Sequence, residues 1–152
     1  MAPSWIEQLK NEVGPGRVVD DAAEIALHSY DWWPVAAKWR RQGKQPFRPD
    51  VVVRPKGADD VSHLLSWASA NGVPVTPRGA GSSVTGAPLP MQGGISLDMS
   101  AMRSVLALDE TNLLVRVEAG TIGHELEERL NARGYTLNHS RLKWYLAPAP
   151  TI

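Results

Sequence analysis

A short glycine-rich segment that directly follows an apolar run is the feature that most constrains this fold. Residues 73–76 are Val-Pro-Val-Thr, typical of a short strand, and residues 77–86 are Pro-Arg-Gly-Ala-Gly-Ser-Ser-Val-Thr-Gly. Glycine permits positive φ and lets backbone N–H groups approach a ligand closely. Successive N–H groups in such a turn form a concave anion site. The segment therefore predicts either a cradle for phosphate or pyrophosphate or an ordinary glycine-rich loop.

Two widespread phosphate-binding motifs do not fit this loop. The dinucleotide motif Gly-x-Gly-x-x-Gly begins at Gly79-Ala80-Gly81 but requires a third glycine where Val84 stands. The nucleoside-triphosphate motif requires Lys and a hydroxyl residue directly after its second glycine. Gly81 and Gly86 have the right spacing, but Ala87-Pro88 follow them. The absence of that lysine argues against γ-phosphate chemistry.

The loop and its flanks resemble the FAD-binding fold of the p-cresol methylhydroxylase and vanillyl-alcohol oxidase family. In the D-lactate dehydrogenase, glycolate oxidase and alkyl-dihydroxyacetonephosphate synthase branches, a Pro-x-Gly-x-Gly-[Ser/Thr]-Ser loop follows a short strand, as it does here. The resemblance runs in order from residues 49–55, Pro-Asp-Val-Val-Val-Arg-Pro, through Glu118-Ala119-Gly120 to about Ser140. It implies an α+β fold, the first βαβ subdomain of an FAD-binding domain of the p-cresol methylhydroxylase type plus part of the second, truncated.

The resemblance also implies a cofactor and the residues that hold it. The implied cofactor is FAD, and the implied binding residues are Pro77, Arg78, Gly79, Ala80, Gly81, Ser82, Ser83, Thr85 and Gly86. Some relatives bind FAD covalently through a histidine just after the loop glycines. Ser82 occupies that position and cannot make the bond, so we expect non-covalent FAD. The family draws its catalytic acid and base mainly from later segments, so no catalytic residue is named.

The chain is expected to have three parts. Residues 1–48 are N-terminal helices and a basic, tryptophan-rich arm, residues 49–140 a partial FAD-binding domain, and residues 141–152 a tail unlike the family. In relatives a second glycine-rich loop and a substrate-binding cap domain follow. The tail indicates a truncated or frame-shifted reading frame, or else an ordered replacement segment. An uncovered sheet face would then favour self-association or a missing partner chain.

The arm combines aromatic and basic residues. No acidic residue lies between Asp31 and Asp50, while this stretch holds Trp32, Trp33, Lys38, Trp39, Arg40, Arg41, Lys44 and Arg48. Such a mixture can bind single-stranded nucleic acid by stacking, or its tryptophans can pack on neighbouring protein. Packing is the stronger interpretation, because 16 basic and 16 acidic residues cancel overall. No nucleic-acid partner is expected.

Local patterns predict the helices and strands. Ser4 with Glu7, and Asp21 with Glu24, have capping-box spacing and predict two short helices. A strand at 51–54, a helix capped by Asp59 or Asp60 and ended by Gly72, and a strand at 73–76 form a βαβ unit. Beyond the loop we expect a half-buried strand at 95–98, a hairpin turning at 110–112, and a helix capped by Thr121. Residues 135–137 are expected to return toward the sheet. The apolar faces of the three longer helices are Ile6, Leu9 and Val13; Val61, Leu64, Leu65 and Ala68; and Ile122, Leu126 and Leu130.

Composition narrows the function classes further. The chain has no cysteine, so disulfides, thiolate metal sites and catalytic thiols are excluded. The histidines, His28, His63, His124 and His139, lack metal-binding spacing, and no metal is expected. His63 and His124 lie on predicted helices and are expected to be surface or cap residues. The sequence shows neither a signal-peptide pattern nor an apolar run of about 20 residues, so the default location is cytoplasmic, with no transmembrane segment.

Two functions follow as alternatives from the resemblance. The first is the FAD-binding portion of an oxidoreductase acting on a 2-hydroxy acid or a similar substrate, incomplete as an enzyme. The second is a non-catalytic remnant or interaction module that uses the same scaffold. Nucleic-acid binding through the arm is the weaker third reading.

Overall fold

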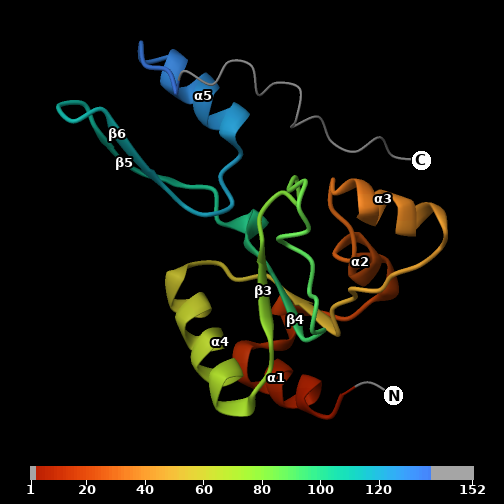
Figure 1. Ribbon diagram of the computed structural model, residues 1–152. Coiled ribbons are helices and arrows are strands. Elements are labelled where there is room, and N and C mark those ends of the chain that lie inside the picture. The colour runs from red at the N-terminus through yellow and green to blue at the C-terminus, as the bar shows by residue number, and fades with distance from the viewer. Residues whose placement is uncertain (1–2, 138–152) are drawn as a thin grey trace. The chain divides into compact units, whose positions relative to one another are not determined.

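The computed structural model describes residues 3–137. These residues form two compact units, which meet in the sequence between Met102 and Arg103. The first unit holds a four-stranded sheet with helices, and the second holds a two-stranded sheet and one helix (Figure 1). The glycine-rich loop belongs to the first unit.

The sheet of the first unit has the strand order β1-β2-β4-β3. The strands are β1 (Val18–Val19), β2 (Val51–Val53), β3 (Val75–Arg78) and β4 (Ile95–Asp98). β2, β4 and β3 are parallel to one another, and β1 pairs antiparallel with β2. The three parallel strands therefore have their carboxyl ends at one edge, which is where ligands commonly bind in such sheets.

Helices cover both faces of this sheet. α1 (Trp5–Val13) and α4 (Ala58–Asn71) pack on the face formed by Val51, Val53, Ile95 and Leu97, and together they make the main apolar core. On the opposite face, Ser96 of β4 meets His28, the residue that ends α2 (Ala22–Leu27). Figure 1 shows α1 and α4 on one side of the strands and α2 on the other.

Because both faces are covered, β4 differs from its prediction. All four residues of β4 are buried, so the half-buried strand expected at 95–98 is wrong. A strand buried on both faces is typical of the centre of a parallel sheet. The predicted strand at 51–54 is confirmed as β2, with every residue buried.

Several predicted helices form, but with different caps. Asp21 caps α2 as predicted by accepting from the backbone N–H groups of Ala23 and Glu24. Ser4 makes no cap hydrogen bond, because its own backbone is already helical. Gly57 precedes α4 in place of an aspartate cap, and Asp60 instead reaches back to accept from the backbone N–H of Lys56. Capping-box spacing was therefore sufficient at α2 and insufficient at α1.

The apolar faces agree largely with their predictions. Ile6, Leu9 and Val13 are buried on α1, and Leu64 and Ala68 are buried on α4. The prediction that Leu65 is buried is wrong, since 46% of its surface is exposed. Gly72 ends α4 in the left-handed conformation, as predicted. The arm contributes α3 (Pro34–Arg41), whose only buried residue is Ala36.

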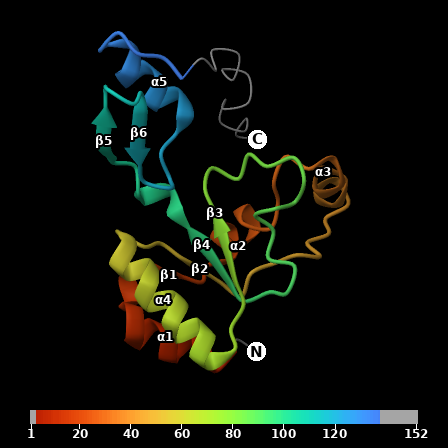
Figure 2. The same cartoon turned by 60° about the vertical axis from the view of Figure 1, so that its left-hand side comes forward.

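The second unit contains the predicted hairpin. β5 (Val105–Asp109) pairs antiparallel with β6 (Leu114–Val117), and a bulge interrupts the ladder between Val105 and Ala107. The carboxylate of Asp109 accepts from the backbone N–H groups of Thr111 and Asn112, which stabilises the turn. The hairpin stands out in Figure 2.

The helix of this unit is α5 (Gly123–Asn131), with Leu126 and Leu130 buried. Ile122 takes the cap position predicted for Thr121, whose buried hydroxyl has no hydrogen-bond partner among the described residues. Residues 135–137 form no strand, although a return to the sheet was expected there. None of the helices within residues 3–137 combines the length and apolar character needed to cross a membrane.

Candidate functional site

The glycine-rich loop follows the edge strand β3 at the carboxyl end of the sheet, as Figure 2 shows in light green. β3 begins at Val75, two residues later than expected, and it includes Pro77 and Arg78. Two of the predicted loop residues are therefore the last strand residues, and the loop itself begins at Gly79. Proline lacks a backbone N–H and is tolerated in edge strands, which explains why the ladder extends through Pro77.

The first half of the loop presents unused backbone donors. The backbone N–H groups of Gly79, Ala80, Gly81 and Ser82 make no hydrogen bond within the described part of the chain. Gly81 has φ +67°, a left-handed conformation that favours glycine. Gly79, Ala80 and Ser82 are exposed, so an acceptor from outside the protein can reach this stretch of backbone. This half of the loop can therefore donate to an anionic group.

The second half of the loop is tied to the protein. The backbone N–H of Thr85 donates to the hydroxyl of Ser83, and the two hydroxyls lie 3.2 Å apart. The backbone N–H of Gly86 donates to Asp31 of the arm. Ser82 is exposed and has an available hydroxyl. The predicted site residues thus divide into a donor-presenting half and an anchored half.

Arg78 places a cation directly beside the loop. Its Nη2 donates to the backbone carbonyl of Leu27 at 3.2 Å, and its Nη1 is buried without a partner among the described residues. Burial lowers the pKa of Arg78, while the charges of Asp31 and Asp98 act in the opposite direction. A buried donor without an acceptor costs about 1–3 kcal/mol. An anion at the loop would remove that cost, so these residues fit the pyrophosphate of FAD.

Arg54 and Asp98 form an ion pair at the same edge of the sheet. Asp98 is the last residue of β4 and Arg54 follows β2, so the parallel register places them side by side. Arg54 Nε donates to Asp98 Oδ2 at 2.9 Å, and Arg54 Nη2 donates to Glu24. Burial would raise the pKa of Asp98, but hydrogen bonds from Arg54 and Ser100 outweigh it and lower the pKa.

His28 is a buried residue for which the sequence analysis assigned no role. It is 5% exposed, its Nδ1 lies 2.8 Å from the hydroxyl of Ser96, and its Nε2 lies 3.8 Å from Asp98. Burial and then the charge of Arg78 lower the pKa of His28. In the sequence, Ser96 and Asp98 are polar residues inside a predicted strand, and this pattern could have indicated a buried polar partner such as His28. Ser96 has no exposed surface, so this Ser-His-Asp group is structural and not a hydrolytic triad.

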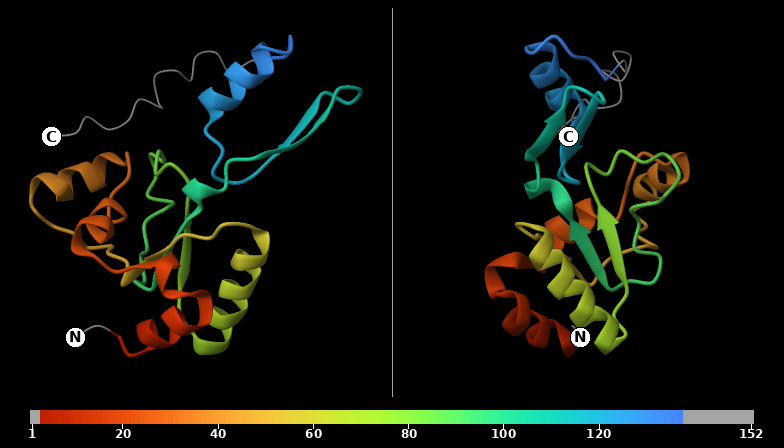
Figure 3. Two further views of the ribbon diagram at one scale, coloured as in Figure 1. Left: turned by 180° about the vertical axis from the view of Figure 1, so that it is seen from behind. Right: turned by 90° about the vertical axis from the view of Figure 1, so that its left-hand side faces the viewer.

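The arm lies against the loop (Figure 3). The backbone N–H of Trp32 donates to the carbonyl of Ser83 at 2.9 Å. The ring of Trp33 packs edge-to-face on Trp39, which packs in turn on Phe47. These contacts support the packing interpretation for Trp33 and Trp39, whereas 49% of the surface of Trp32 is exposed.

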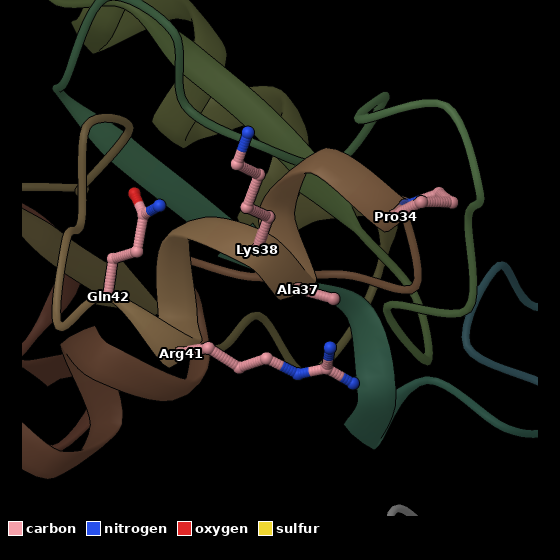
Figure 4. Close-up of a pocket in the computed structure, with 5 residues that line it drawn as sticks. All are labelled: Pro34, Ala37, Lys38, Arg41 and Gln42. Atoms are coloured by element: carbon pink, nitrogen blue, oxygen red, sulfur yellow. The ribbon is translucent and has the colours of Figure 1, made fainter.

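A hollow of about 400 Å³ lies on the exposed side of α3. Its lining residues are Pro34, Ala37, Lys38, Arg41 and Gln42, and Figure 4 shows Lys38 and Arg41 extending from the helix in different directions. None of the loop residues lines it. The hollow is therefore a basic surface of the arm, separate from the candidate cofactor site.

The other described histidines are surface residues, as predicted. His63 pairs with Glu12, and His124 pairs with Glu128 on the same helix. No cluster of three or more potential ligands that could hold a metal ion occurs among residues 3–137. His139, which the sequence analysis left without a role, lies outside the described residues.

Comparison with known proteins defines the family. The model of a family described as FAD binding domain matches residues 49–144, which is most of the chain, and the chain belongs to this family. The glycolate oxidase subunit GlcD of Bacillus subtilis (strain 168) is 31% identical over 128 residues, covering 84% of this chain and 25% of the relative. The predicted family is thereby confirmed.

Solved structures agree with this assignment. A structure of alkyldihydroxyacetonephosphate synthase matches with a TM-score of 0.80 and 28% identity, covering 91% of this chain and 28% of that one. A substrate-bound structure of p-cresol methylhydroxylase matches with a TM-score of 0.68 and 14% identity, covering 85% and 24%. The second likeness shows the fold alone and confirms the predicted fold class. The chain spans about a quarter of the length of these relatives.

Proposed function

We propose that the loop at residues 77–86 binds the pyrophosphate of FAD without a covalent bond. The observation that carries the proposal is the row of unused backbone N–H groups from Gly79 to Ser82. The unpartnered Nη1 of Arg78 adds a positive charge beside them. Ser82, Ser83 and Thr85 add hydroxyl donors, and Gly86 closes the turn. The membership of an FAD binding domain family supports FAD as the source of this anion.

We also propose that this chain is the FAD-binding portion of an oxidoreductase acting on a 2-hydroxy acid or a similar substrate. Glycolate, named for the relative from Bacillus subtilis, is a 2-hydroxy acid. Bound FAD would supply the two-electron acceptor for such an oxidation. The residues of this chain would hold and orient it through the loop and Arg78. No residue within 3–137 is assigned as a catalytic acid or base.

Titration followed by ¹H–¹⁵N NMR tests the binding site directly. FAD should shift the backbone amide signals of residues 79–83, while riboflavin, which carries no phosphate, should leave them in place. Arg78→Met should weaken the FAD-induced shifts, and Arg41→Met on the exposed side of α3 serves as the matched control. FAD-induced shifts confined to other residues would remove the loop from the site.

A further inference from the structure

Asp31 joins the arm to the far end of the glycine-rich loop. Its Oδ2 accepts from the backbone N–H of Gly86 at 2.9 Å, and its Oδ1 accepts from the backbone N–H of Trp33 at 3.0 Å. Asp31 and Gly86 are 55 residues apart in the sequence. A single carboxylate thus spans two segments that no local pattern connects.

Two further contacts strengthen this junction. The backbone N–H of Trp32 donates to the carbonyl of Ser83 at 2.9 Å. The ring of Trp33 lies so close to Gly86 that a Cβ at this position would be 2.9 Å from Cε3. Gly86 also has φ +81°, so both its conformation and its neighbour require glycine. The arm therefore holds the loop at Ser83 and at Gly86.

A loop rich in glycine and serine has many conformations when it is free, and binding a ligand must fix one of them. Fixing the backbone of each residue costs conformational entropy, so a loop that is already held binds its ligand more tightly. We propose that Asp31 is a positioning residue: it holds residues 83–86, the anchored half of the loop, so that residues 79–82 are presented to the FAD pyrophosphate. This inference rests on the proposed function of the loop and gives the tryptophan-rich arm a role in it.

The chemistry of the carboxylate suits this role. Both of its oxygens accept, so it can serve Gly86 and Trp33 at once. An amide of the same shape has one accepting oxygen, and its NH₂ group would face a backbone N–H. Asp31→Asn therefore removes one hydrogen bond while preserving the size of the side chain.

The test measures amide hydrogen exchange and FAD affinity in Asp31→Asn. Asp21→Asn is the matched control, since Asp21 also accepts two backbone N–H groups but only within α2. In Asp31→Asn we expect exchange to rise about tenfold at Gly86 or at Trp33, whichever N–H loses its acceptor, and FAD affinity to fall about tenfold, the change that about 1.4 kcal/mol produces. Asp21→Asn should leave both quantities as in the parent.

A second variant changes the loop residue of the junction, Gly86, and leaves Asp31 in place. Gly86→Ala should displace the ring of Trp33, while Gly72→Ala has a similar positive φ with open space around it. Unchanged exchange at both Gly86 and Trp33 in Asp31→Asn, or unchanged exchange at the Trp32 amide in Gly86→Ala, overturns the proposal. Faster exchange with unchanged FAD affinity also overturns it. If FAD causes no amide shifts in the parent chain, the proposed function itself is overturned. Hydrogen exchange is measured without FAD, so it tests the junction separately.

Discussion

The guanidinium of Arg78 covers Gly81, so that a Cβ on Gly81 would lie 2.2 Å from Nη2 of Arg78. The last residue of β3 thus folds back over the loop that follows it. Any side chain at position 81 must displace a buried cation as well as accept a left-handed backbone. The two residues together set the shape and charge of the candidate site.

Gly81→Ala is therefore expected to weaken FAD binding about tenfold, because it moves an arginine whose charge-assisted hydrogen bond is worth about 1.5–3 kcal/mol. Gly72→Ala is the matched control, with φ +64° and nothing within 4 Å of the added Cβ. Calorimetric titration with FAD measures the affinity. Equal affinity in Gly81→Ala and the parent would contradict a site at this loop.

Arg54→Met should lower the free energy of unfolding by about 2 kcal/mol. The change leaves Asp98, which is 5% exposed, without its main partner. Breaking a buried pair costs about 3–5 kcal/mol, and the cost is smaller here because the Arg54 side chain is 37% exposed. Urea denaturation measures it against Arg133→Met, whose exposed pair with Glu110 should contribute less than about 1 kcal/mol. Equal effects of the two variants would contradict the assignment.

His28 should make the protein less stable in mild acid. Its folded pKa is lowered from 6.5, so the unfolded chain binds the proton more readily. The stabilisation is present above the unfolded pKa and is lost as the pH falls through the folded pKa. Denaturation between about pH 7.5 and about pH 5 should show this decline in the parent and a weaker decline in His28→Gln. A parent without this decline would contradict the prediction.

Tryptophan fluorescence should distinguish one accessible ring from several protected ones. Trp32 is half exposed, while Trp33 and Trp39 are partly buried against other aromatic rings. In a Trp144→Phe background, Trp32→Phe should remove most of the fraction that iodide quenches, and the remaining emission should be blue-shifted. Quenching of all the remaining tryptophans to the same extent would show that the arm does not pack as described.

The 152-residue chain alone should be a poor flavoenzyme. A few N–H and hydroxyl contacts must offset an association cost of about 4–15 kcal/mol, so little FAD would stay bound to accept electrons. We expect little FAD to remain after gel filtration and no reduction of dye that depends on D-lactate or glycolate. A stoichiometric yellow monomer that oxidises either substrate would overturn this expectation.

Local chemistry in the sequence was sufficient for most elements of the fold. Three successive valines predicted β2, Asp21 predicted the start of α2, and Gly72 predicted the end of α4, because each depends on the conformational preferences of one or a few adjacent residues. The donor-rich loop was likewise visible, since glycine and hydroxyl side chains are adjacent in the chain. Its assignment to FAD came from a family resemblance that the family match then supported.

Only the tertiary structure decided which surfaces are covered and which distant groups meet. Leu64 and Leu65 both belong to the apolar face predicted from helical periodicity, yet only Leu64 is buried. Burial depends on where α1 and β4 lie and not on periodicity alone. The pairing of Asp31 with Gly86 joins residues 55 positions apart, and no local pattern predicts it. The burial of His28 beside Ser96 depends on the same kind of contact. Sequence by itself determined the local conformations and the donors of this protein, whereas the packing of separate segments decided how those donors are held, because such contacts depend on three-dimensional proximity.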